Sequence, residues 1–360
     1  MDGAIHMKAQ NNTYDMNRVR LRECVPLDTP FQFCIEPTFL CNFRCNYCMH
    51  AASKDELEKH GFSFSSMSWD MFELILNQLT EFPRKIKKVT FSGFGEPLLD
   101  KRLPEMIRRI KEEDITEKIL VISNGVLLTS ELWTELVSAG LSEIKISIQG
   151  MSADKYKKIC EATINFEEFL KMLTYAYKHR GNCIVRIKIA DAALDVGEDK
   201  LFYEKFGSIC DYIAIEHIYE QFKFVDYEGK LESGYKNNRF GYDFKPINVC
   251  SALFFKMNVL QDGRITFGYP DGVTFEGFSV GKKSLYDVWN SPERYVFLTD
   301  NLTGNYDNRK DCRSCTRWAY SVVPEDLLDG HEAEILTRMP PIDTRKYLRK
   351  PIVLCGNVNC

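Results

Sequence analysis

An α/β fold is predicted for this chain, in which a parallel sheet of about six strands curves into a partial (β/α)6, TIM-like barrel. Short and nearly continuous apolar runs recur along the chain, as is typical of parallel strands covered by helices. Segments with a helical spacing of apolar residues separate these runs, and this alternation predicts βα units. A chain of 360 residues is long enough for such a barrel and a smaller unit beside it.

The apolar runs and the helical patterns place each element in order. Strands are expected at residues 31–35, 88–91, 119–123, 144–148, 183–189 and 212–216. Helices are expected at residues 67–82, 103–112, 130–139, 166–178 and 199–206. The first helix has its apolar residues along one face, and Pro83 ends it. In such barrels the loops that follow the strands carry the functional residues.

The regular alternation stops after His217, which divides the chain into predicted parts. Residues 248–320 are expected to form a hairpin, with strands at 257–260 and 265–267, followed by a helix at 285–298. The predicted parts are an N-terminal extension (1–30), the barrel (31–220), a linker or lid (221–247), the hairpin and helix unit (248–320) and a C-terminal tail (321–360).

Composition narrows the classes of function. The net charge of −4 gives no basis for nucleic-acid binding, so no nucleic-acid partner is expected. No run of 18 apolar residues exists, and no membrane partner is expected. Residues 1–10 lack the apolar core of a signal peptide. Thirteen cysteines without a signal peptide predict reduced thiols, metal binding and a cytoplasmic location.

Three cysteines follow the first predicted strand in a C-x3-C-x2-C run, at Cys41, Cys45 and Cys48. Three thiolates on one tight loop can hold three irons of a [4Fe–4S] cluster and leave the fourth iron open to another ligand. The alternative is a structural zinc site, which needs four closed ligands. This loop offers three, with His50 as a further candidate, so the pattern favours iron and sulfur.

This spacing, with Tyr47 before the third cysteine, resembles the signature of the radical S-adenosylmethionine (SAM) family. Residues 91–97, FSGFGEP, resemble the family's Gly-Gly-Glu segment, and the likeness extends over roughly residues 31–220. The resemblance implies that the open iron chelates SAM. An electron from a flavodoxin or ferredoxin-type donor would then release a 5′-deoxyadenosyl radical, which removes hydrogen from an unactivated carbon.

The resemblance also implies which residues contact SAM after the second predicted strand. Gly93 and Gly95 would let the backbone approach the methionine part of SAM without a Cβ clash. Glu96 or neighbouring backbone carbonyls would accept hydrogen bonds from the SAM ammonium.

Four more residues are candidate cofactor contacts on the later strands. Ser147 and Gln149 leave the fourth predicted strand in the same direction and could bond the ribose hydroxyls. Arg186 could pair with the SAM carboxylate, the alternative being an ordinary surface ion pair. Asn124 could contact SAM or only its own loop.

A second set of cysteines, Cys250, Cys312 and Cys315, brackets the predicted hairpin. Their order resembles the SPASM and Twitch branch of the family, whose auxiliary domain holds a further [4Fe–4S] cluster. The Twitch pattern has a cysteine after the hairpin, where this chain has Gly268.

This departure leaves the auxiliary site open in three ways. The cluster could keep one open iron, or it could be lost while the hairpin remains. Alternatively, Asp271, Cys355 or Cys360 could supply the missing ligand. The other cysteines have no motif and are interpreted as structural; they include Cys34 and Cys160.

Glu216 and His217 end the sixth predicted strand and are the candidate catalytic bases. The family resemblance implies oxidation of a small polar substrate such as a sugar or an aminocyclitol-like alcohol, with the auxiliary cluster as electron acceptor. A maturase of a ribosomal peptide is the alternative, although only about 30 residues precede the first predicted strand, where many maturases carry a longer peptide-binding module. Redox-neutral epimerisation or dehydration also remains open, and a non-catalytic scaffold is disfavoured by the intact cysteine triad.

Overall fold

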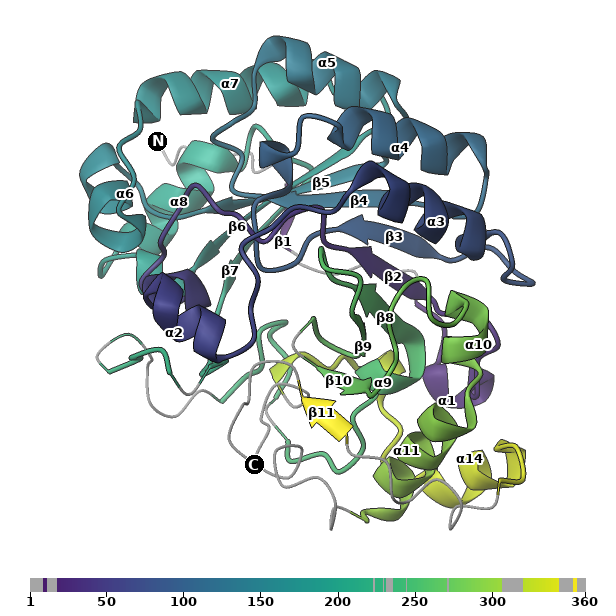
Figure 1. The fold of residues 1–360 in the computed structure, drawn as a ribbon. Helices are drawn as coiled ribbons and strands as arrows, with labels where there is room; N and C mark the ends of the chain where they lie inside the picture. Colours follow the sequence, from purple (N-terminus) through teal and green to yellow (C-terminus); the bar gives the residue numbers. More distant parts are fainter. Residues whose placement is uncertain are drawn as a thin grey trace.

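The computed structural model describes residues 9–11, 18–222, 224–228, 230, 236–243, 245–270, 272–305, 320–342 and 352–354. The described strands form a single curved sheet with helices against it (Figure 1). Their order across the sheet is β1-β7-β6-β5-β4-β3-β2-β8-β9-β10-β11. Neighbours from β1 to β8 are parallel, and those from β8 to β11 are antiparallel. The predicted class, a partial TIM-like barrel, is confirmed.

The six predicted barrel strands are present, with ends displaced by at most one residue. The strands are β1 Gln10–Asn11, β2 Gln32–Ile35, β3 Lys88–Phe91, β4 Ile119–Ser123, β5 Glu143–Ile148, β6 Ile184–Ala190, β7 Tyr212–Glu216, β8 Lys256–Val259, β9 Ile265–Phe267, β10 Val273–Phe275 and β11 Ile352–Leu354. Strands β2 to β7 are the barrel strands, and the polar loops after them meet at one edge of the sheet.

The predicted helices are also present, although two of them differ in extent. The helices are α1 Leu21–Cys24, α2 Lys54–Lys59, α3 Trp69–Leu79, α4 Leu103–Glu112, α5 Ser130–Ser138, α6 Ala153–Cys160, α7 Phe166–Lys178, α8 Glu198–Phe206, α9 Ala252–Phe255, α10 Leu285–Trp289, α11 Pro292–Thr303 and α14 Glu332–Arg338. α3 begins later than predicted because Ser68 caps it, accepting from the Met71 amide at 3.1 Å. The helix predicted at 285–298 is two helices, since Ser291 caps α11 through the Arg294 amide at 3.3 Å.

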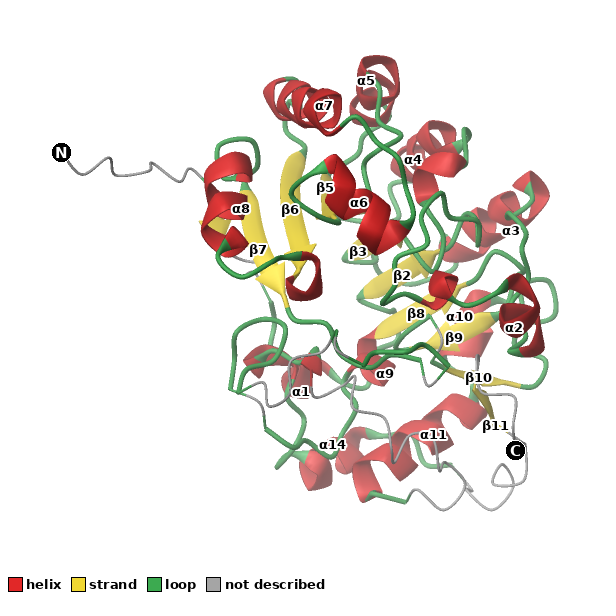
Figure 2. Cartoon of the chain, turned by 90° about the vertical axis from the view of Figure 1, so that its left-hand side faces the viewer, coloured by secondary structure: helices red, strands yellow, loops and turns green. Residues whose placement is uncertain are grey.

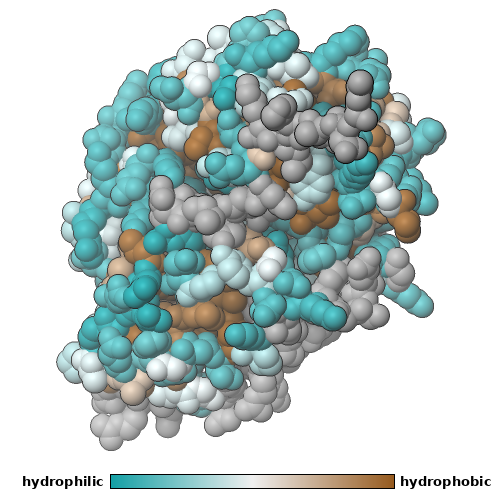
Figure 3. Space-filling view, turned by 180° about the vertical axis from the view of Figure 1, so that it is seen from behind, coloured by the Kyte–Doolittle hydropathy of each residue, from teal (hydrophilic) through white to brown (hydrophobic). Residues whose placement is uncertain are grey.

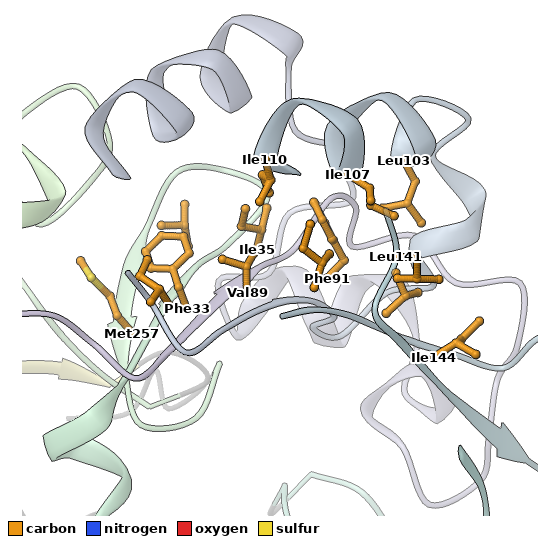
Figure 4. Close-up of a cluster of buried hydrophobic side chains, with 14 of the residues drawn as sticks. Phe33, Ile35, Val89, Phe91, Leu103, Ile107, Ile110, Leu141, Ile144 and Met257 are labelled. Carbon is orange, nitrogen blue, oxygen red and sulfur yellow. The ribbon is translucent and has the colours of Figure 1, made fainter. Parts of the chain in front are cut away.

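The core lies between the sheet and the helices on its outer side (Figures 1 and 2). Phe33 of β2 and Phe91 of β3 are fully buried, as are Ile107 and Ile110 of α4 (Figure 4). Each such side chain contributes roughly 1.5–3 kcal/mol when it leaves water. This packing fixes the strands, and with them the positions of the loops at their carboxyl ends.

The predicted hairpin continues the barrel sheet. β8 pairs in parallel with β2, so that Gln32 lies opposite Lys256 and Ile35 opposite Val259. The antiparallel strands β9 and β10 follow, and β11, from the segment predicted to be a tail, pairs with β10. The hairpin is therefore anchored directly beside the strand that precedes the three cysteines.

Among the described residues, no helix combines the length and the apolar character needed to cross a membrane. The face seen from behind carries mainly hydrophilic residues, with hydrophobic ones showing between them (Figure 3).

Candidate functional site

The loop that carries Cys41, Cys45 and Cys48 leaves the carboxyl end of β2 and closes in a tight turn. The Cys48 amide donates to the Cys45 carbonyl at 2.9 Å. The Phe43 amide lies 3.5 Å from the Cys41 sulfur, where it can donate a hydrogen bond to a thiolate. The three thiols of the predicted cluster site therefore lie on one compact and hydrogen-bonded loop.

The electrostatics of these thiols suits a positively charged partner. Burial raises the pKa of Cys41 to about 12, and burial also raises the pKa of Cys48. A hydrogen bond to the Cys160 side chain, together with burial, raises the pKa of Cys45 well above its usual range. Three thiolates so close together need cations to balance their charge, and iron supplies them.

A hydrogen bond of His50 weighs against the zinc alternative. Its Nε2 lies 3.0 Å from the Phe94 carbonyl oxygen, and burial lowers the pKa of the ring. That hydrogen bond holds the ring on the loop after β3. Within the described ranges, no three His, Cys, Asp or Glu side chains gather around a single metal ion. A cubic cluster has no such requirement, because each thiolate binds a different iron.

Gly95 is required by the cysteine loop. A Cβ atom at this position would lie 2.1 Å from the Thr38 carbonyl oxygen and 2.6 Å from that of Leu40. The next residue, Glu96, donates its amide to the same Leu40 carbonyl at 2.8 Å. A direct backbone contact between two loops thus requires this glycine, and its predicted role in making space for SAM stays a prediction.

Glu36 is a buried carboxylate that the sequence analysis did not single out as a site residue. Its Oε1 accepts from the Phe94 amide at 2.5 Å and from the Gly95 amide at 3.4 Å. A Cβ atom on Gly93 would lie 2.5 Å from the same oxygen. Gly93 therefore leaves room for Glu36, which ties the root of the cysteine loop to the glycine segment.

Burial raises the pKa of Glu36 to about 8, against about 4 for a glutamate in an unfolded chain. Between these values the folded protein holds one proton more than the unfolded chain, so its free energy of unfolding falls as the pH rises. Glu36→Gln keeps an oxygen acceptor and removes the titration. We therefore compare the two melting temperatures at each pH. The difference, variant minus natural protein, should rise by several degrees from pH 5 to pH 8.

Scanning calorimetry across this pH range measures the difference. Glu58→Gln, on the exposed side of α2, serves as the control and should show a constant difference. A constant difference for Glu36→Gln as well would mean that Glu36 is ionised in the folded protein throughout this range.

Glu96 fastens the loops after β3 and β4 to each other. Its Oε1 accepts from the Leu98 amide at 2.9 Å and the Ser123 hydroxyl at 2.7 Å, and its Oε2 accepts from the Asn124 amide at 2.7 Å. Both carboxylate oxygens are thus engaged within the protein. Of the two predicted acceptors for the SAM ammonium, the neighbouring backbone carbonyls suit this arrangement better.

Most of the remaining predicted cofactor contacts lie at the cysteine loop, and Arg186 lies apart from it. Asn124 bonds the side chain of Asn42 in the cysteine loop, with Nδ2 2.8 Å from Oδ1. Tyr47 donates its hydroxyl hydrogen to the Gln149 side chain, and Gln149 Nε2 lies 3.4 Å from the Ser147 carbonyl oxygen. The structure therefore joins the predicted residues of β4 and β5 to the cysteine loop.

Arg186 lies apart from this group, and its contact with SAM stays a prediction. The residue is buried near the start of β6, and its Nε lies 2.6 Å from Glu143 Oε1 at the start of β5. Its guanidinium also stacks 3.9 Å from the ring centre of Tyr212. These partners hold Arg186 near the amino ends of β5 and β6. The cysteine loop, by contrast, follows the carboxyl end of β2.

The two candidate bases differ sharply in their surroundings. Burial alone would raise the pKa of Glu216, but nearby Arg239, Lys188 and Lys145 hold it well below its usual range. These cations favour the ionised carboxylate, and the role of Glu216 as a base stays a prediction. His217 places Nδ1 2.8 Å from Asp191 Oδ2, and a carboxylate in that position orients a histidine that accepts a proton.

The short helix α6, absent from the sequence-based expectation, docks against the cysteine loop. Backbone amides of Arg44 and Asn46 donate to the carbonyls of Cys160 and Ile159, at 2.9 Å and 2.8 Å. The two donors, Arg44 and Asn46, are the sequence neighbours of Cys45. No motif marked Cys160, because its place beside Cys45 arises only from the docking of α6.

Residues 35–189 match the family model of the Radical SAM superfamily. These residues form a Radical SAM domain. It is 25% identical over 326 residues to the tungsten-containing aldehyde ferredoxin oxidoreductase cofactor-modifying protein of Pyrococcus furiosus, covering 77% of this chain and 86% of that protein. It is 37% identical over 129 residues to a probable GTP 3′,8-cyclase of Methanococcus maripaludis, covering 36% of this chain and 39% of the cyclase.

The structure of SuiB from Streptococcus suis bound to S-adenosylmethionine has the same fold. Its TM-score is 0.56 at 15% identity, and the match covers 83% of this chain and 74% of that one. Radical SAM enzymes use a [4Fe–4S] cluster together with SAM. The soft sulfur donors on the loop after β2 suit such a cluster.

The auxiliary site is described only in part. Cys250 precedes α9, and its amide donates to Asn301 Oδ1 at 2.9 Å. Gly268 has a φ of +78°, which strains any L side chain, and a Cβ there would lie 3.3 Å from Leu253 Cδ2. The hairpin geometry thus disfavours a cysteine at this position. The other candidate ligands, Cys312, Cys315, Asp271, Cys355 and Cys360, lie outside the described residues.

Proposed function

We propose that this radical SAM enzyme removes a hydrogen atom from a small polar alcohol, such as a sugar or a cyclitol, and oxidises it. Cys41, Cys45 and Cys48 would hold the [4Fe–4S] cluster, and SAM would lie against the segment 93–96. The cluster and SAM supply the hydrogen-abstracting radical when they are bound. The observation that carries this proposal is the three-cysteine loop fastened to the glycine segment through Glu36 and Gly95.

Aromatic side chains shield the cysteine loop from water. Phe39 and Met49 belong to a buried cluster that also includes Phe222 and Tyr227, from the segment predicted as a linker or lid. The Phe94 ring lies 6.1 Å from that of Phe222. Shielding of this kind protects a reactive intermediate from side reactions, which supports a lid role for the start of this segment.

The pair Asp191 and His217 supports the oxidation of an alcohol. Both residues follow neighbouring strands, β6 and β7, at the edge from which the functional loops leave. Asp191 Oδ1 also accepts from the Ile218 amide at 3.2 Å, which fixes the carboxylate beneath the imidazole. His217 would take the hydroxyl proton while the hydrogen atom leaves the carbon, and the remaining electron needs an acceptor. The auxiliary cluster is the proposed acceptor, a flavodoxin or ferredoxin-type protein is the proposed reductant, and the proposed location is the cytoplasm.

Product analysis tests this function. The reconstituted enzyme, supplied anaerobically with SAM, dithionite and a panel of sugars and cyclitols, should form 5′-deoxyadenosine together with a product two hydrogens lighter. His217→Ala should lower substrate-dependent turnover about 100-fold or more, since general base catalysis contributes roughly that much. His179→Ala, an exposed histidine at the end of α7, is the matched control and should retain full activity.

Other products would redirect the assignment. A product of unchanged mass would favour epimerisation, and loss of water would favour dehydration. Turnover only with a peptide would favour the maturase alternative. Full activity of His217→Ala would remove His217 from the proposal.

A further inference from the structure

A group of charged side chains lines one face of β5, β6 and β7. Ser147 lies opposite Lys188 in the parallel register, and Lys188 lies opposite Ala214, two residues before Glu216. Since side chains alternate along a strand, Lys145, Lys188 and Glu216 share a face, and the buried isoleucines of these strands share the other. This shared face is the one turned away from the outer helices.

The charges on this face do not balance. Glu216 Oε2 accepts from Lys188 Nζ at 2.8 Å and from the Arg239 guanidinium. Two cations thus bond one anion. Lys145, whose pKa burial lowers to about 7, lies close enough to lower the pKa of the same carboxylate. Lys88 adds a further positive charge near Lys145. Arg186 and Glu143, lower on the same face, neutralise each other.

Two buried polar atoms at this group lack hydrogen-bond partners among the described residues: Glu216 Oε1 and Arg239 Nε. One is an acceptor and the other a donor. A buried polar atom without a partner costs roughly 1–3 kcal/mol, so a ligand that satisfies both would be favoured. The Lys188 and Arg239 side chains are 22% and 23% exposed, so solvent and small molecules reach them.

We propose that Lys145, Lys188 and Arg239 bind an anionic group of the substrate, a phosphate or a carboxylate, while Glu216 Oε1 accepts from one of its hydroxyls. The inference rests on the proposed function, because it names the class of its substrate as an anionic sugar or hydroxy acid. His217 follows Glu216 at the carboxyl end of β7, the end of the sheet from which the functional loops leave. A cationic aminocyclitol would meet the like charges of Lys188 and Arg239 and is disfavoured.

Titration calorimetry with defined probes tests the anion site. The probes are glucose 6-phosphate, glucuronate and neutral glucose, added anaerobically to the reconstituted enzyme with SAM. We expect at least one anionic probe to bind about ten-fold or more tightly than glucose, since hydrogen bonds to charged groups contribute on that order. Comparison of the phosphate with the carboxylate probe identifies the preferred anion.

The variants Lys188→Met and Lys145→Met should each weaken the anionic probe about ten-fold or more and leave glucose unchanged. Lys171→Met, on the exposed face of α7, is the matched control and should bind as the natural protein does. Circular dichroism and iron content after reconstitution confirm that the variants fold. Equal affinity for charged and neutral probes, or unchanged anion affinity in both variants, would overturn the proposal. If the anions bind as expected but no alcohol is oxidised, the anion site stands and the proposed function fails.

Discussion

Replacement of Cys45 by alanine should abolish the formation of 5′-deoxyadenosine and leave the protein folded. Cys41 and Cys48 alone offer two thiolates, and two cannot hold a cube with a single open iron. The same loss is expected for Cys41→Ala and Cys48→Ala. Chromatography of the nucleoside after anaerobic reduction with dithionite measures the effect, which should exceed 100-fold (about 3 kcal/mol in the barrier).

A matched control separates loss of the cluster from loss of the fold. Cys210 is also buried, and its thiol donates to the Phe206 carbonyl at 3.2 Å. It lies before the start of β7, at the end of the strand opposite to the functional loops. Cys210→Ala should therefore retain SAM cleavage at a modest cost in stability. Nucleoside amounts like those of the natural protein from any of the three loop variants would refute the assignment of the cluster.

Gly95→Val should cause the second large loss, of both cluster and SAM binding. A Cβ atom would lie 2.1 Å from the Thr38 carbonyl oxygen. Both contacting groups are backbone, so relief of the clash requires a shift of the chain that destabilises the fold. The loops after β2 and β3 would have to separate, which displaces the cysteines. Iron content after reconstitution should fall severalfold, and the melting temperature should fall by roughly 5 °C or more.

Gly277→Val provides the comparison. Gly277 has a φ of +79°, but a Cβ atom there would meet nothing within 4 Å. This variant carries backbone strain without a clash and should bind iron and SAM normally. Normal iron content in Gly95→Val would show that the two loops are not held together as described.

The barrel was predictable because each of its strands carries a short run of buried apolar residues. The runs at β3 and β4, for example, are marked by Val89, Phe91 and Val121, all fully buried. The short strands β10 and β11 were missed, since three residues carry no period. The helix α6 was missed for a similar reason, because only Tyr156, Ile159 and Cys160 of its eight residues are buried.

The candidate site was predictable where covalent spacing determines it. Cys41, Cys45 and Cys48 lie on one loop in any fold of the chain, so their pattern alone indicated a cluster. The partners of Arg186 and Glu216 depend instead on how β5, β6 and β7 are aligned and on where the segment with Arg239 returns. No local pattern encodes such contacts, and the role of Glu36 likewise became visible only through its bond to Phe94.

The central claim is that a cluster on the loop after β2 binds SAM at an open iron. Electron paramagnetic resonance of the dithionite-reduced protein tests it most directly, in a variant with Cys250, Cys312 and Cys315 replaced by alanine, so that no auxiliary signal interferes. We expect about four irons per chain and a [4Fe–4S] signal that shifts when SAM is added. A signal that stays unchanged with saturating SAM, or a protein without iron, would contradict it.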